Sequence, residues 1–510
     1  MCDKPRCNRL QRAAARRGAR RILPVPPVLG PLMPMLAFRS ARRPRTLRLA
    51  SLSGWIVPVF LVASCGGGGG GGSSSPPAAS TAPPTVDQLA NVCTIPGEKA
   101  WELAHLNDVY LFYRDIVPVD PNAYATAEAY FYALLVPSKD RFSFVEPQSV
   151  ADAFFNAGQD VGFGGVFKLD ASNKLRIGFV DAGGPLALQN VARGAEIQTV
   201  AGAAVSSYST SALNALLFPS SVGVSLTMTV LDSGRTVPRT ITVASTNVVE
   251  NPVPLAQVIP ADAANPLSAK VGYLLFTDHI ATSEAALVSA ITGFQAAGVS
   301  DVVVDLRYNG GGFLYIASEL AYMLAGNRIA ANATFEKLLF NDMHPEKTSN
   351  PANTVPFYNA STGGQALPTL NLARVFVITA PGTCSASESV INGLAPFVQV
   401  IRIGGTTCGK PYGFIQTNNC GNAYFAIQFQ GVNNVGFGDY TAGFAPTCVV
   451  ADDFSRALGD RDEGRLSATL AYSRGGTCPA VTASAQDGLQ AATALEGSLG
   501  RPERQRRLLR

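Results

Sequence analysis

Residues 373–410 read "ARVFVITAPGTCSASESVINGLAPFVQVIRIGGTTCGK". An apolar, β-branched run at 373–380 is typical of a buried strand, and a Pro-Gly pair then predicts a turn. A helix is expected from about Ser385 to the break at Pro396, and residues 397–403 read as a second apolar strand. Strand, helix and strand in this order predict a right-handed βαβ unit with two parallel strands.

The lengths of these pieces place two reactive side chains together. A helix of about 12 residues spans roughly 18 Å, and the following strand returns about as far at ~3.3 Å per residue. The loop "GGTTCGK" therefore ends where the helix began, so Lys410 is expected beside Ser385.

The preceding segments repeat the pattern of alternating strands and helices. A strand at 271–280, a helix at 283–298 and a strand at 301–308 lead into "NGGG" at 309–312, which a further helix follows. Parallel strands share a carboxyl edge, where open α/β sheets bind ligands. The glycine loop should therefore meet Ser385 and Lys410, while Asp305 and Arg307 are expected to be structural.

A hydroxyl, an amine and backbone N–H donors at one edge are what acyl transfer requires. The amine must be neutral to accept a proton. The pKa of Lys410 must therefore fall by about 3 units from ~10.4, a change worth roughly 4 kcal/mol. The apolar neighbours Ile403, Tyr412 and Phe414 favour the neutral amine. The alternative is a serine-rich helix cap without chemistry.

Three motifs in order carry a resemblance to a known family: "DLRYNGGG" at 305–312, "SASE" at 385–388 and "GK" at 409–410. Over roughly 90–480 the chain resembles the C-terminal processing, or tail-specific, serine peptidases. The resemblance implies a multidomain α+β fold with a helical N-terminal region, a PDZ-like β-module and a crotonase-like α/β catalytic core.

The resemblance also implies roles for individual residues. Ser385 is the nucleophile, because it lies 25 positions before the lysine, and Lys410 is the general base. The backbone N–H groups of Ala386 and Gly312 match the oxyanion donors, with Gly311 as the alternative to Gly312.

One position departs from the family pattern. Members carry a glutamine four residues after the lysine, where this chain has Phe414. Gln416 is the nearest glutamine and is the candidate for orienting Lys410.

Residues 158–249 alternate short β-like runs with turns, as small β-modules do. The segment "VDAGGPLALQNVARGAEIQTVAG", residues 180–202, resembles a PDZ domain, although Ala195 and Ala201 stand where family members have Asp and Asn. In this interpretation Gly162, Phe163 and Gly164 would bind a peptide's terminal carboxylate through backbone N–H groups. The alternative is a module that only supports the next domain.

The other boundaries follow from composition. Residues 87–157 have apolar residues at helical spacing, which predicts an N-terminal helical domain. Residues 250–482 are predicted to form the catalytic domain, and residues 483–510 a disordered or helical tail.

The N-terminus resembles an export signal. Basic residues precede the apolar run 49–64, and Val62-Ala63-Ser64-Cys65 resembles a lipoprotein signal in which Cys65 carries the lipid. Residues 1–64 are then the signal with a basic extension, with the true start at Met33 or Met35, and the Gly/Ser/Pro segment 65–86 is a tether. An ordinary signal peptide is the alternative. The prediction is a bacterial cell-envelope protein, lipid-anchored to a membrane.

Charge argues against nucleic acid as a partner. The first 48 residues hold 13 Lys or Arg and the last ten hold five Arg, whereas residues 49–500 carry 22 basic and 34 acidic residues, a net charge of about −12. Phosphate binding needs clustered cations.

Six cysteines after Cys65 predict disulfides in an exported chain. We favour Cys408–Cys420 and Cys448–Cys478 from their spacing. A Cys384–Cys408 bridge, which would join both catalytic loops, is a competing hypothesis. No metal and no cofactor is predicted, and the acidic segments 450–454 and 458–464 read as solvated loops.

Together these patterns predict a serine endopeptidase that cleaves peptides or unfolded protein segments through a Ser–Lys dyad. The alternatives are an envelope lipoprotein that binds protein tails or ligands without cleaving them, and an esterase or amidase on the same scaffold.

Overall fold

The computed structural model describes residues 84–170, 172–262, 269–480 and 507–508. The chain divides into two units, Met1–Ala79 and Ser80–Arg510, and the first lies outside the described residues. The predicted export signal, lipidation at Cys65 and most of the tether also fall outside them. Among the described residues no helix is long and apolar enough to cross a membrane.

The N-terminal region is helical, as predicted. Helix α2 (Ile95–Val109) and helix α3 (Ala127–Leu134) each begin after a threonine, Thr94 or Thr126, whose hydroxyl accepts a backbone N–H of the first turn. Two more helices complete the region: α1 (Val86–Leu89) and α4 (Gln148–Ala157).

This region joins the end of the catalytic region. Strand β1 (Phe144–Pro147) pairs antiparallel with β20 (Asn422–Phe425), which pairs with β19 (Thr417–Asn419). A disulfide between Cys93 and Cys420 also links the N-terminal region to the segment of β19 and β20. The prediction of Cys408–Cys420 is therefore wrong, because Cys420 is used by a partner 327 positions away. The predicted Cys448–Cys478 bridge is confirmed.

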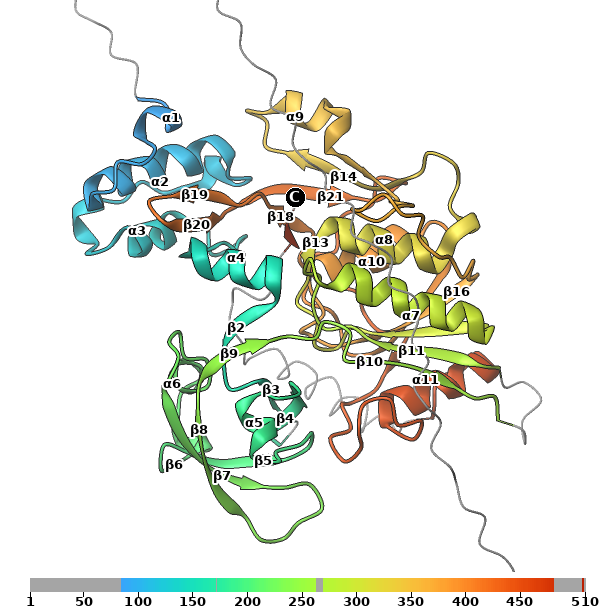
Figure 1. Cartoon of the computed structure of the whole chain (residues 1–510). Coiled ribbons are helices and arrows are strands. Elements are labelled where there is room, and N and C mark those ends of the chain that lie inside the picture. The colour runs from blue at the N-terminus through green and yellow to red at the C-terminus, as the bar shows by residue number, and fades with distance from the viewer. Residues whose placement is uncertain (1–83, 171, 263–268, 481–506, 509–510) are drawn as a thin grey trace, which may run out of the picture. The chain divides into compact units, whose positions relative to one another are not determined.

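Residues 159–249 form a β-module with its own hydrophobic core (Figure 1). Alternate residues of β7 are buried, as a half-covered strand requires. Its strands are β2 (Gln159–Gly162), β3 (Gly165–Leu169), β4 (Leu175–Val180), β5 (Glu196–Val200), β6 (Ala203–Ala204), β7 (Ser225–Leu231), β8 (Arg239–Ala244) and β9 (Thr246–Val249). Helices α5 (Pro185–Leu188) and α6 (Thr210–Leu217) complete it.

The central sheet has the order β10-β11-β12-β16-β17-β22 and is parallel from β11 onward. Helices cover both faces (Figure 1). Val302 and Val304 pack into one core with α7, α8 and α10, while Val303 between them packs into another with α11. The strands are β10 (Leu255–Ile259), β11 (Val271–Leu275), β12 (Asp301–Asp305), β16 (Arg374–Thr379), β17 (Gln399–Gly404) and β22 (Cys448–Val449), and the helices are α7 (Ser283–Ala297), α8 (Leu314–Ala325), α10 (Ala386–Leu394) and α11 (Gly464–Gly475). The predicted βαβ unit is β16-α10-β17.

A further sheet was not predicted. Its order is β13 (Gly312–Phe313), β23 (Arg507–Leu508), β18 (Tyr412–Phe414), β21 (Ile427–Val432), β14 (Thr334–Phe340) and β15 (Thr354–Pro356). Residues 507–508 of the predicted tail pair with two strands of the catalytic region, and the rest of residues 483–510 lies outside the described residues.

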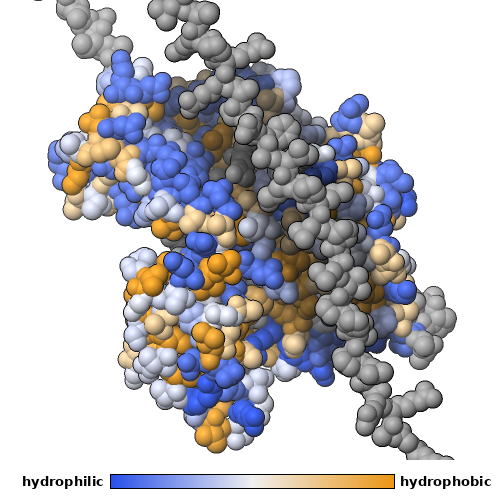
Figure 2. Space-filling model, viewed as in Figure 1, coloured by the Kyte–Doolittle hydropathy of each residue, from blue (hydrophilic) through white to orange (hydrophobic). Residues whose placement is uncertain are grey.

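Apolar side chains on the surface are scattered. Figure 2 shows hydrophobic residues interspersed with hydrophilic ones on the visible face of the described residues. Exposed examples such as Val117, Leu188 and Val237 are distant in sequence. Single apolar residues of this kind are normal on a protein surface.

Candidate active site

Ser385 lies at the N-cap of α10, where the strand β16 has given way to the helix. Its backbone has φ 61° and ψ −117°, a conformation that a residue with a side chain adopts at a cost of roughly 1–3 kcal/mol. Its Oγ is buried and has no hydrogen-bond partner among the described residues. The hydroxyl is thus held in a strained turn and left free to react.

Glu388 ties this turn to the lysine loop. Its buried carboxylate accepts hydrogen bonds from the backbone N–H groups of Ser385 at 3.0 Å, Gly409 at 2.8 Å and Lys410 at 2.8 Å, and from the Thr407 hydroxyl. Burial raises the pKa of Glu388 above its ordinary value, and these donors oppose the rise. We had assigned Glu388 no role, although the spacing Ser-x-x-Glu is the signature of a capping box.

A disulfide joins the same two loops. Cys384 and Cys408 are bonded, with their Cα atoms 5.1 Å apart, which confirms that hypothesis. Each cysteine lies within two positions of Ser385 or Lys410, so the bridge and Glu388 together fix how the two loops meet.

Lys410 is fully buried. Its Nζ lies 3.8 Å from the centre of the Phe414 ring and 5.2 Å from that of Phe142. Gln416 directs its amide nitrogen elsewhere, to Asp152 at 3.3 Å and Asn418 at 2.9 Å. We therefore do not assign Gln416 the role of orienting Lys410.

Asn309 connects the glycine loop to the serine turn. Its carbonyl accepts the Cys384 N–H at 3.1 Å and the Ser387 hydroxyl at 3.1 Å. Its side-chain oxygen accepts the Gly311 N–H at 2.9 Å and faces Nδ1 of His279 at 3.0 Å. Because the Gly311 N–H is occupied, it is not available to an oxyanion.

Gly312 is positioned by His279. The Gly311 carbonyl accepts the His279 N–H at 3.0 Å, and the His279 carbonyl accepts the Phe313 N–H at 2.7 Å. Because backbone groups alternate along an extended chain, the N–H and C=O of Gly312 face the opposite side. A Cβ at Gly312, where φ is 134°, would lie 2.2 Å from the His279 carbonyl oxygen, so only glycine fits.

His279 is buried and neutral. Burial is the main reason that its pKa falls to about 3. His279 supports the glycine loop through its backbone hydrogen bonds with Gly311 and Phe313.

A buried ion network lies behind the glycine loop. Arg307 is fully buried and pairs with Asp305, Asp452 and Glu463. Asp305 and Arg307 are therefore structural, as predicted. The prediction of solvated acidic loops is wrong for Asp452 and Glu463, which are buried in this network because two arginines compensate their charge.

The network reaches the β-module. Arg193, in the loop before β5, donates to the Tyr308 hydroxyl at 2.6 Å and to Asp452 at 2.5 Å. Tyr308 itself lies in the stretch 305–312 that carries the glycines. The module is thus bonded to the residue two positions before the first glycine of the loop.

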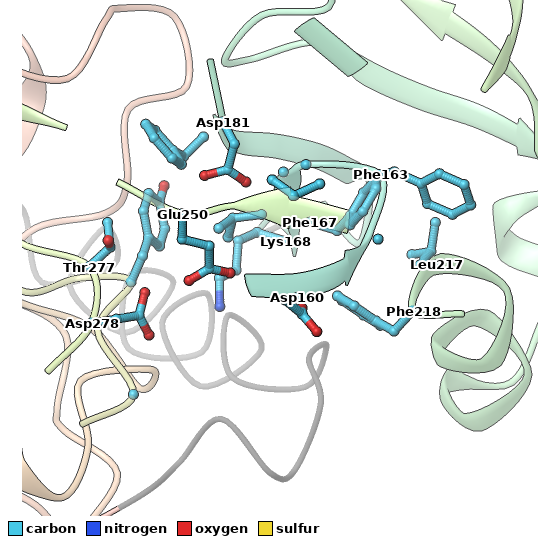
Figure 3. Close-up of a pocket in the computed structure, with 18 of the residues that line it drawn as sticks. Asp160, Phe163, Phe167, Lys168, Asp181, Leu217, Phe218, Glu250, Thr277 and Asp278 are labelled. Carbon is cyan, nitrogen blue, oxygen red and sulfur yellow. The ribbon is translucent and has the colours of Figure 1, made fainter. Parts of the chain in front are cut away.

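A pocket opens beside the predicted carboxylate-binding loop. Gly162, Phe163 and Gly164 line it together with the apolar side chains of Phe167, Leu217 and Phe218. Figure 3 shows that carboxylates also line this pocket. They belong to Asp160, Asp181, Glu250 and Asp278, with Lys168 among them. The pocket extends to Gly310 and Gly382, which flank the catalytic loops.

The pocket favours positive over negative charge, because four acidic side chains face one lysine. Burial raises the pKa of Asp181 to about 6.

Two protein-family models match parts of this chain. A family model described as "Peptidase family S41" matches residues 270–428, and one described as "Peptidase S41 N-terminal domain" matches residues 97–144. A search of curated protein sequences gave no match.

Two solved structures illustrate the likeness. A protein from Bacteroides fragilis NCTC 9343 described as an S41 protease is 25% identical with a TM-score of 0.59, over 74% of this chain and 97% of that one. The photosystem II D1 C-terminal processing protease is 20% identical with a TM-score of 0.44, over 69% of this chain and 92% of that one.

Proposed function

We propose that this chain, whose residues 270–428 match the model of peptidase family S41, is a serine endopeptidase working through Ser385 and Lys410. The observation that carries the proposal is the buried, unpartnered Ser385 Oγ in a strained turn, bonded through Glu388 to the loop of Lys410.

The reaction follows from these groups. Neutral Lys410 takes the proton of Ser385 as Oγ attacks the substrate carbonyl, and the N–H groups of Ala386 and Gly312 stabilise the oxyanion. The first N–H groups of a helix have no intrahelical acceptor, which leaves that of Ala386 available. Lys410 then returns the proton to the departing amine. Water repeats the sequence on the acyl-enzyme, releasing the acid and restoring Ser385.

The substrates we propose are peptides and unfolded protein segments, held partly by the pocket of the β-module. A peptide carboxylate would bind at Gly162, Phe163 and Gly164, apolar side chains beside Leu217 and Phe218, and basic side chains near the acids. Peptides with an apolar terminus and upstream arginines should therefore bind more tightly than peptides with upstream glutamates, as measured by fluorescence anisotropy.

We place the protein in the bacterial cell envelope, anchored by a lipid on Cys65. The support is the sequence of residues 49–86 alone. Metabolic labelling with a radioactive fatty acid should mark the wild type and not Cys65→Ser.

The test of peptidase activity compares matched buried residues. Wild type should degrade unfolded casein, and Ser385→Ala and Lys410→Met should lose at least ~10³-fold in rate. Ser318→Ala in α8 and Lys99→Met in α2 are the controls, since each removes a buried serine or lysine bonded to distant carbonyls. Equal activity of Ser385→Ala and wild type would refute the assignment.

The other outcomes separate the alternatives. If casein stays intact while Ser385-dependent hydrolysis of small esters or amides occurs, the esterase or amidase is correct. If wild type is inert on all substrates yet binds peptide tails as Ser385→Ala does, the chain is a binding protein.

A further inference from the structure

Two short strands beside the active site leave a space one strand wide. β13 (Gly312–Phe313) and β18 (Tyr412–Phe414) do not pair with each other; both pair with β23 between them. Neighbouring strands lie about 4.8 Å apart, so β13 and β18 stand roughly 10 Å apart. We call this space the strand slot.

The strand slot borders the reactive groups. On one side is Gly312, whose N–H and C=O face away from His279 and toward the slot. On the other side is Phe414, whose ring touches the Lys410 Nζ. A peptide that adds a strand here would lie against the proposed oxyanion donor and beside the proposed base, which is the β-strand addition mode of peptide recognition.

Residues of this chain fill the strand slot. Arg507 and Leu508 run parallel to both flanking strands, with Arg507 opposite Gly312 and Leu508 opposite Phe313 and Phe414. We infer that the tail, residues 501–510, is an intramolecular inhibitor, with Arg507 and Leu508 occupying the substrate position. The inhibition of cleavage rests on the proposed function, whereas binding of the tail in the strand slot does not.

Chain length and charge favour this occupant. The 26 residues between 480 and 507 can span up to about 85 Å when fully extended. The tail carries five arginines and one glutamate, whereas residues 49–500 have a net charge of about −12. Opposite charge attracts the tail to the body, and salt should weaken the attraction.

The size of the inhibition follows from effective concentration. Because the tail belongs to the same chain, its effective concentration at the slot is taken as about 1 mM, so a tail that binds in trans with a Kd of about 100 µM raises the apparent KM roughly tenfold. Substrate must displace the tail before it can reach Ser385.

Two variants test the inference: a chain that ends after Arg506, and a full-length chain with Leu508→Pro. Each should have a kcat/KM on a peptide substrate about tenfold higher than wild type at low salt. Proline lacks the backbone N–H that a strand donates, whereas the control Leu508→Ala keeps it and should behave as wild type. Unchanged kcat/KM in both variants would overturn the inference.

A binding assay gives an answer without any catalysis. A labelled peptide of residues 499–510 should bind to the Ser385→Ala chain ending at Arg506, and at least tenfold more weakly to full-length Ser385→Ala. Equal binding to both chains, or equal binding of a scrambled peptide of the same composition, would contradict the occupancy. If no variant cleaves anything, the proposed function fails while this assay still decides the inference.

Discussion

The carboxylate of Glu388 accepts the backbone N–H of Lys410 at 2.8 Å, across 22 positions of sequence. The same carboxylate holds the N–H of Ser385. One side chain on the first turn of a helix therefore fixes the backbones of both proposed catalytic residues, in a place from which water is excluded.

Replacing Glu388 with glutamine should damage both activity and stability. The amide group turns an NH₂ donor toward backbone donors, leaving at least one buried N–H unpaired at a cost of about 1–3 kcal/mol. We expect kcat to fall at least tenfold and the urea midpoint to drop. Glu319→Gln is the control. Burial raises the pKa of Glu319 to about 8, so glutamine resembles its protonated form at pH 7 and should cost little.

The Cys384–Cys408 disulfide should matter for catalysis beyond its contribution to stability. Removing either it or Cys448–Cys478 with paired alanines should cost roughly 3 kcal/mol, since the two bridges close loops of similar length. Only the first pair adjoins Ser385 and Lys410, so only its loss should lower kcat. An equal fall in kcat for both pairs would contradict the role of the bridge in placing the loops.

Buried histidines should make the protein acid-sensitive. Burial lowers the pKa of His279 to about 3 and that of His105 to about 4, from the ordinary histidine value of 6.5. Between these values and 6.5 the unfolded chain binds more protons, so stability falls as pH drops through that window. Each histidine contributes up to about 1.4 kcal/mol per pH unit. The urea concentration at the unfolding midpoint should decrease as the pH is lowered from 6.5 to 4.5, and it should decrease less steeply in His105→Gln.

A substitution in the turn between β5 and β6 should stabilise the protein. Ala201 adopts φ 48°, a conformation that costs an L-residue about 1–2 kcal/mol and that glycine accepts freely. Ala201→Gly should stabilise the β-module by roughly 1 kcal/mol in urea unfolding. Ala203→Gly, two positions later in β6 where φ is not positive, should instead destabilise it slightly.

Much of the catalytic sheet could be predicted because its elements are long and periodic. The alternation of strand and helix over 270–410 correctly placed the turn of Ser385 and the loop of Lys410 at one edge. The sheet that flanks them could not be predicted, since β13 and β23 have two residues each and show no period. Asp452 was misread for a related reason: the arginines that allow its burial lie 145 and 259 positions away.

The acidic lining of the pocket could not be predicted either. The sequence predicted that Gly162, Phe163 and Gly164 of the module bind a peptide, but the four carboxylates that line the pocket come from separate strands and loops. Disulfide connectivity was equally out of reach, because Cys93 and Cys420 meet only through the pairing of β1 with β20.

The most direct measurement is covalent labelling with a peptide β-lactone, which acylates an activated serine, followed by mass mapping of the modified site. The account predicts one adduct on Ser385 in the wild type, and no adduct when Lys410 is replaced by methionine although the chain remains folded. An adduct on a different residue, or undiminished labelling of Ser385 in Lys410→Met, would contradict it.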